Sequence, residues 1–158
     1  MVVNQQKRLV VDLAAVRAFV KRLRATLRLG GRDFNVCFVD DREIRRLNVA
    51  YLGRRRATDV LSFAWRGTDR VKAEPANAEF ANFLGDVVIS VETAQRNARR
   101  EVHSTRNEIR WLILHGLLHL LGYDHERDQG EMTSLELSLR ERLGIAGQGA
   151  GGRKRARR

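Results

Sequence analysis

Three of the four histidines in the chain fall within one short stretch that has the spacing of a metal site. His115 and His119 are four residues apart, so on a helix they project from the same face, one turn apart. His125 follows Gly122, a residue suited to the left-handed conformation that ends a helix and turns the chain back. Three imidazoles can hold Zn²⁺ and leave its fourth position open for water. We therefore predict one Zn²⁺ per chain, bound by His115, His119 and His125.

The alternative for these histidines is a hydrogen-bonded place in the protein core, because residues 111–121 are almost all apolar. An imidazole buried there costs free energy unless it finds a partner. A shared metal ion supplies that partner to all three rings at once, which favours the metal hypothesis. His103 lies outside the stretch and is not expected to be a ligand.

The spacing His-x3-His-x2-Gly-x2-His is also that of the metzincin proteases, with one difference. Those enzymes carry glutamate directly after the first histidine, where it acts as the general base. This chain has Gly116 at that position, and glycine cannot take a proton. The sequence therefore argues against ordinary zinc proteolysis.

The charge of the chain indicates a polyanionic partner. The 158 residues carry a net charge of +11, and five of the basic groups lie in residues 149–158, which leaves +6 for the rest. Such an excess favours nucleic acid binding, although solvated surface arginines are the alternative.

The chain contains no stretch of about 18 apolar residues, so no transmembrane helix is expected. The single cysteine, Cys37, suits a reducing cytoplasm, and we expect it to pack on a strand.

The histidine stretch needs a scaffold, and patterns of apolar residues predict one. A helix should begin at the capping pair Thr105 and Glu108 and end before Gly122. Other helices should begin at Asp12, Asp40 and Ser90, and a last one should end at Gly144. The helix after Asp12 should end at Gly30, and the helix after Ser90 near residue 102. Strands are expected at residues 8–11, 34–39, 60–64 and 86–90, with a long loop at 66–82.

These elements predict a single α/β (α+β) domain over residues 1–147, followed by a flexible basic tail at 148–158. The order is β-α-β-α-β-β-α-α-α, with about four strands in one mixed sheet and about five helices packed on it. Mixed strand directions are expected because two strands follow one another without an intervening helix.

The histidine run also closely resembles the signature of the bacterial YbeY family, the rRNA maturation endoribonucleases. That pattern is His-Gly-x-Leu-His-Leu-x-Gly-Tyr-Asp-His, and every fixed position is met. Further family motifs are resembled in order: Leu-Asn-x-x-Tyr at residues 47–51, Thr-Asp-Val-Leu-Ser-Phe at 58–63, Leu-Gly-Asp-Ile-x-Ile-Ser at 84–90, with Val87 in place of its first isoleucine, and the last helix at 131–136.

The resemblance implies a single zinc, an RNA substrate, and maturation of ribosomal RNA at the 3′ end of the small-subunit (16S) RNA. The implied partners are rRNA and the small ribosomal subunit, in the cytoplasm, with neither DNA nor a membrane. One departure concerns the family arginine thought to face the active site, because Leu52 stands at its position. Arg54, Arg55 and Arg56 follow directly, and we predict that they contact RNA in its place.

The sequence leaves the chemical mechanism open in two respects. Either water or the ribose 2′-hydroxyl could attack the phosphodiester. Asp86 and Asp124 are candidates for the general base, and Asp124 is equally a candidate for orienting a ligand imidazole. Neither is assigned a catalytic role.

Three functions remain as hypotheses. The first is a zinc-dependent endoribonuclease specific for single strands, acting in rRNA maturation and ribosome biogenesis. The second is an rRNA- or ribosome-binding assembly factor whose metal is structural. The third is another metal-dependent hydrolase, such as a peptidase, which Gly116 disfavours.

Overall fold

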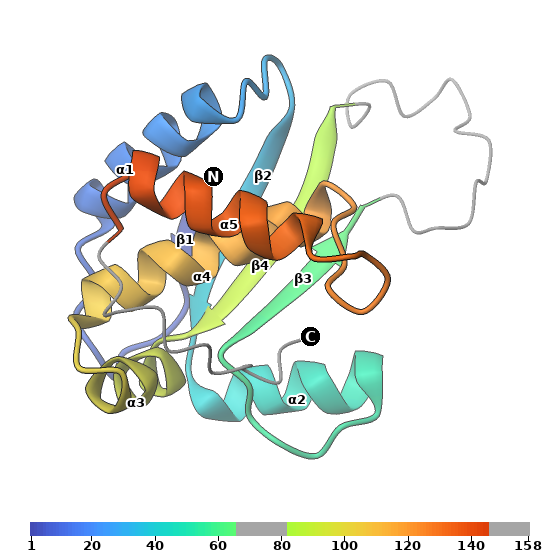
Figure 1. Cartoon of the computed structure of the whole chain (residues 1–158). Helices are drawn as coiled ribbons and strands as arrows, with labels where there is room; N and C mark the ends of the chain where they lie inside the picture. Colours follow the sequence, from blue (N-terminus) through green and yellow to red (C-terminus); the bar gives the residue numbers. More distant parts are fainter. Residues whose placement is uncertain (66–81, 146–158) are drawn as a thin grey trace.

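The computed structural model describes residues 1–65 and 82–145 (Figure 1). The nine elements follow the predicted order, in a single α+β domain. They are β1 (Val2–Asn4), α1 (Leu13–Thr26), β2 (Asp33–Val39), α2 (Asp41–Leu52), β3 (Val60–Ala64), β4 (Phe83–Ser90), α3 (Val91–Arg100), α4 (Thr105–Leu120) and α5 (Glu131–Arg142).

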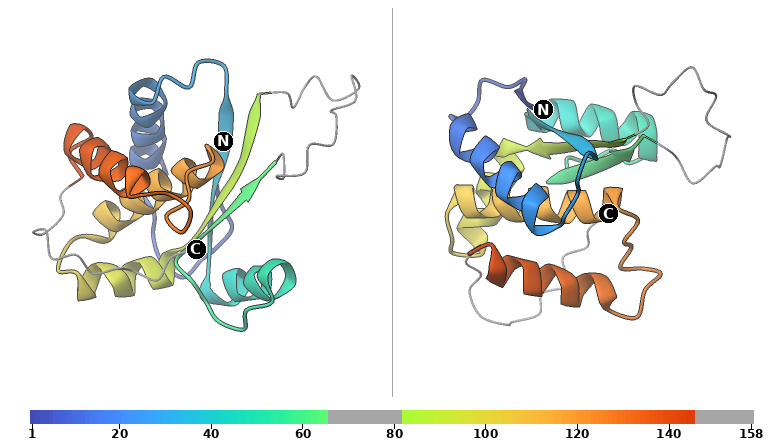
Figure 2. Two further views of the ribbon diagram at one scale, coloured as in Figure 1. Left: turned by 45° about the vertical axis from the view of Figure 1, so that its right-hand side comes forward. Right: turned by 90° about the horizontal axis from the view of Figure 1, so that it is seen from above.

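The four strands form one mixed sheet in the order β1-β2-β4-β3. β1 pairs with β2 and β2 with β4 in parallel, whereas β3 pairs with β4 in antiparallel orientation. The mixed directions confirm the expectation from two consecutive strands. Seen from above, α2 covers one face of the sheet, and α4 packs on the other face with α5 outside it (Figure 2). The helix that carries two of the histidines therefore lies in the middle of the molecule.

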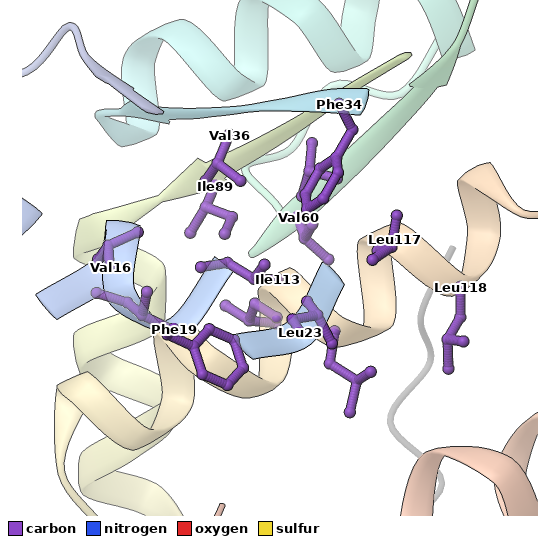
Figure 3. Close-up of a cluster of buried hydrophobic side chains, with 14 of the residues drawn as sticks. Val16, Phe19, Leu23, Phe34, Val36, Val60, Ile89, Ile113, Leu117 and Leu118 are labelled. Atoms are coloured by element: carbon purple, nitrogen blue, oxygen red, sulfur yellow. The ribbon is translucent and has the colours of Figure 1, made fainter. Parts of the chain in front are cut away.

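The core lies between α4, α1 and the sheet, and it explains why α4 is apolar on nearly all sides. Alternate strand residues point toward these helices, as the two-residue period of a strand requires. Figure 3 shows part of this cluster of buried side chains, which includes Phe19, Leu23, Val36, Phe38, Val60, Val87, Ile89, Leu112, Ile113 and Leu117. A smaller cluster under α2 contains Val39, Ile44, Leu61 and Val88.

Gly116 lies on the side of α4 that faces β3 and β4. A Cβ atom at this position would stand 2.6 Å from Cγ1 of Val87 and 3.1 Å from Oγ of Ser62. The Ser62 hydroxyl donates a hydrogen bond of 3.0 Å to the Gly116 carbonyl. The glycine thus has a packing role, because it allows the metal helix to approach the sheet.

Replacing Gly116 by alanine is expected to lower the free energy of unfolding, by up to about 2 kcal/mol. Overpacking costs about 1–3 kcal/mol, and the higher helix propensity of alanine offsets about 1 kcal/mol of it. Val87 cannot swing aside easily, because its branched Cβ restricts it to few rotamers. Denaturant unfolding of Gly116→Ala measures the change. The penalty should shrink in a Val87→Ala background, and a Gly116→Ala protein more stable than wild type would contradict the close contact.

The predicted first strand at residues 8–11 is wrong, because the strand is Val2–Asn4. Gln6 explains the difference. Its side-chain oxygen accepts hydrogen bonds from the backbone N–H groups of Arg8 and Leu9, and its amide donates to the Leu9 carbonyl. These contacts fold the segment around one buried side chain, which takes Leu9 away from sheet pairing.

Two helices end earlier than predicted, and each ends through a residue that is not glycine. α1 stops at Thr26 instead of reaching Gly30, because Arg28 already adopts a left-handed conformation with φ of 50°. α3 stops at Arg100, and Val102 adopts the same conformation with φ of 56°. The rule that glycine marks the helix end missed the end of α1 for this reason.

Two further boundaries differ from the prediction. β4 begins at Phe83, three residues before the predicted start. The N-cap of α4 is Ser104, whose hydroxyl accepts from the Asn107 N–H, so Thr105 is the first helical residue. The predicted N-caps Asp12, Asp40 and Ser90 are confirmed, each accepting from a backbone N–H three residues later.

The predicted loop at 66–82 and the tail at 148–158 fall almost entirely outside the described residues. Within residues 1–65 and 82–145, no helix is long and apolar enough to cross a membrane.

Candidate metal centre

The C-terminal half of α4 positions the first two histidines. His115 is fully buried, with 1% of its surface exposed, and His119 lies one turn later and is partly exposed. The two ring centroids are 4.7 Å apart, and the two Nε2 atoms approach to 3.1 Å. The spacing of four residues therefore brings the two nitrogens together as predicted.

The turn after α4 brings back the third histidine. Gly122 adopts φ of +97°, its N–H donates to the His119 carbonyl at 3.0 Å, and the Tyr123 N–H donates to the Leu118 carbonyl at 3.1 Å. These two bonds form a Schellman motif, and the left-handed Gly122 confirms the predicted turn at the helix end. The His125 ring then stacks on His115, with centroids 5.1 Å apart. One ligand atom from each of the three histidines lies within 4.8 Å of the others, which is close enough to bind one metal ion.

The donor set suits a divalent ion such as zinc. Two nitrogen ligands of a tetrahedral zinc, each about 2.0–2.1 Å from the ion, lie roughly 3.3 Å apart, close to the spacing of the two Nε2 atoms. Burial, together with the neighbouring His115 and His125, lowers the pKa of His119 from 6.5 to about 4, against opposing contributions from the Tyr123 backbone and Asp124. The ring is thus neutral at pH 7, and neutral imidazole is the form that binds metal.

Glu136 is a member of the site that the sequence analysis missed. Its carboxylate is 6% exposed, with Oε2 placed 3.1 Å from Nδ1 of His115. The indole N–H of Trp111 donates a hydrogen bond to the other oxygen, Oε1. A signal was present, because Glu136 is four residues after Met132 and so falls on the apolar stripe of α5. A carboxylate on a buried stripe indicates a buried partner.

The two aspartates considered as bases lie in different surroundings. Asp124 accepts a hydrogen bond from the Glu126 N–H and so supports its own loop. Asp86 lies within β4 rather than at its start, paired with Phe63, and accepts from the Asn35 amide at 2.9 Å. Because its neighbour Val87 contacts α4, Asp86 points to the opposite face of the sheet, away from the histidines.

His103 lies near the N-terminus of α4, at the other end of the helix from the metal centre. Its Nε2 is 2.6 Å from Oε2 of the fully buried Glu108. The pair Thr105 and Glu108 therefore does not form the predicted capping box. The buried glutamate instead pairs with the partly buried His103.

The predicted arginines lie on the loop between α2 and β3. Arg54 is partly exposed, and Arg55 and Arg56 are exposed. Leu52, at the position of the family arginine, is 48% exposed. Across the part of the chain that the structure describes, no hydrogen bond or ion pair joins these arginines to the histidines. The fold thus brings the three predicted metal ligands together.

Comparison with known proteins indicates the family of this chain. A family profile described as "Endoribonuclease YbeY" matches residues 1–144. An Endoribonuclease YbeY of Syntrophus aciditrophicus is 40% identical over 131 residues, which cover 83% of this chain and 78% of the relative. The Endoribonuclease YbeY of Desulforamulus reducens is 47% identical over 115 residues, covering 72% of this chain and 73% of the relative.

A solution structure from Thermotoga maritima superimposes with a TM-score of 0.61 and covers 97% of this chain and 100% of that one. At 23% identity this likeness shows the fold alone. The extent of the profile match and the identity to the two relatives show the family: the chain belongs to the YbeY family of endoribonucleases.

Proposed function

We propose that this chain is a zinc-dependent endoribonuclease that cuts single-stranded RNA and matures the 3′ end of the 16S rRNA during ribosome biogenesis. The observation that carries the proposal is the convergence of His115, His119 and His125, whose ligand atoms lie within 4.8 Å of one another in a chain of this family. One Zn²⁺ per chain, the small ribosomal subunit as partner, and the cytoplasm as location belong to the same proposal. The one cysteine, free and half-buried, suits that reducing compartment.

The chemistry follows from what surrounds the three rings. When bound, zinc supplies a concentrated positive charge and makes water a stronger nucleophile near pH 7. Gly116 offers no carboxylate beside His115, so amide hydrolysis lacks its usual base. A phosphodiester suits the site better than an amide, because it carries the negative charge that a cationic site can offset directly. Either water or the ribose 2′-hydroxyl is compatible with this arrangement as the attacking group.

The test of substrate class compares two forms of one RNA. Purified protein should cut single-stranded ribosomal RNA at internal positions and leave the same sequence intact when it is annealed to its complement. Gel analysis of end-labelled RNA distinguishes internal cuts from trimming. Equal cutting of the duplex would contradict specificity for single strands.

We propose that Arg54, Arg55 and Arg56 bind the RNA backbone. If an arginine contacts a phosphate, its replacement by alanine should weaken RNA binding. It should also reduce the slope of the logarithm of the binding constant against the logarithm of the salt concentration by about 1. The measurement is the affinity for single-stranded RNA over a series of salt concentrations. For the arginine that takes the place of the family arginine missing at Leu52, the alanine variant should also cleave RNA more slowly.

Lys7→Ala serves as the matched control for these variants. It removes one positive charge from an exposed residue on a different part of the chain. If all three arginine variants behave like this control, the arginines are ordinary surface residues and the assignment is wrong.

A further inference from the structure

The structure assigns a positioning role to Glu136, whose carboxylate fixes which nitrogen of His115 carries the proton. Oε2 of Glu136 faces Nδ1 of His115 at 3.1 Å. A carboxylate accepts hydrogen bonds, so the ring must donate from Nδ1, which leaves the lone pair on Nε2. That is the nitrogen that faces Nε2 of His119 at 3.1 Å. The inference rests on the proposed role of His115 as a metal ligand.

The geometry leaves the carboxylate little freedom. It lies between two rings of α4, with the indole N–H of Trp111 bonded to Oε1 and the imidazole of His115 beside Oε2. Glu136 is 6% exposed and His115 is 1% exposed, so water cannot easily replace either contact. Trp111 and His115 are four residues apart on one helix face, which allows one side chain from α5 to hold both rings.

An amide cannot accept hydrogen bonds from both rings in the way that this carboxylate does. The indole of Trp111 is only a donor, so Glu136→Gln must offer its oxygen to the indole and its NH₂ group to His115. Nδ1 of His115 must then accept, and the ring proton moves to Nε2, where it blocks metal binding. The reverse orientation of the amide places two donors against each other at the indole. The first orientation therefore keeps both contacts only with the His115 tautomer that cannot bind metal through Nε2, and the second loses the contact with the indole.

Nitrogen-15 NMR of the histidine rings tests the inference in metal-free protein. In the wild type, His115 should be protonated on Nδ1. In Glu136→Gln it should shift toward protonation on Nε2, and the zinc affinity should fall roughly 10–100-fold, the usual effect of losing a partner of a metal-ligating histidine. Zinc affinity is measured by competition with a chromophoric chelator.

Two control variants separate positioning from general damage. Trp111→Phe removes the indole donor and leaves Glu136 free to accept from His115, so the Nδ1-protonated form should remain. Glu108→Gln makes the same chemical change in a second glutamate–histidine pair, at the start of α4, where Glu108 contacts His103. It should leave the His115 tautomer and the zinc affinity unchanged.

Protonation of His115 on Nε2 in the wild type would overturn the inference, even if Glu136→Gln does not fold. An unchanged tautomer and zinc affinity in a folded Glu136→Gln protein would overturn it as well. A wild type that binds no zinc would instead remove the metal assignment. The tautomer of the metal-free chain would still decide the role of Glu136, so the two failures are distinguishable.

Discussion

Replacing His115 by alanine should abolish RNA cleavage. The substitution removes one of three proposed ligands and leaves the Glu136 carboxylate buried without its imidazole. Losing only an outer partner of a metal ligand typically costs about 10–100-fold in affinity or activity. Losing the ligand itself should therefore cost more than about 100-fold in the rate of RNA cleavage, measured with excess enzyme on single-stranded rRNA.

The decisive control is to prepare both proteins in the same way, because ribonucleases are common contaminants. Wild type and His115→Ala are purified identically and incubated with the same RNA. Equal cleavage by both would point to a contaminating nuclease and would favour the alternative of an rRNA-binding assembly factor. The wild type should also leave casein intact, because a missing general base typically costs about 10²–10⁴-fold, and Gly116 stands where the metzincin base would be.

Replacing His119 by alanine should abolish stoichiometric zinc. Its Nε2 is 3.1 Å from that of His115, so the substitution removes one of the two nitrogens that face each other across the site. Two histidines cannot complete a site that needs three protein ligands. Metal analysis of purified protein should give about one zinc per chain for the wild type and far less than one for His119→Ala.

His103→Ala is the matched control for this experiment. His103 pairs with Glu108 near the opposite end of α4 and lies outside the proposed metal centre. The variant should retain about one zinc per chain. Full zinc in His119→Ala, or loss of zinc in His103→Ala alone, would show that the ligands are misassigned.

The parts of the fold that sequence predicted are those with local causes. Asp12, Asp40 and Ser90 each cap a helix through a bond to a backbone N–H three residues later. Gly122 adopts the positive φ for which glycine is suited, just after the end of α4. The meeting of the three histidines was predictable for the same reason, since helix periodicity and one turn largely determine it.

The missed features depend on tertiary contacts. Arg28 and Val102 end helices in conformations that their residue types disfavour, so no local pattern marks those ends. The role of Glu136 requires knowing that α5 packs on α4. The packing role of Gly116 likewise requires knowing that Val87 lies beneath it. From sequence, Gly116 indicated only the absence of a base.

The fourth ligand of the zinc tests the central claim most directly. A crystal structure of the zinc-loaded chain should show the ion on His115, His119 and His125, with its remaining position occupied by water. Such an open position is what a catalytic zinc requires, whereas a structural zinc has four protein ligands. A fourth ligand from the protein would contradict the proposed nuclease mechanism and would support a structural metal in an assembly factor.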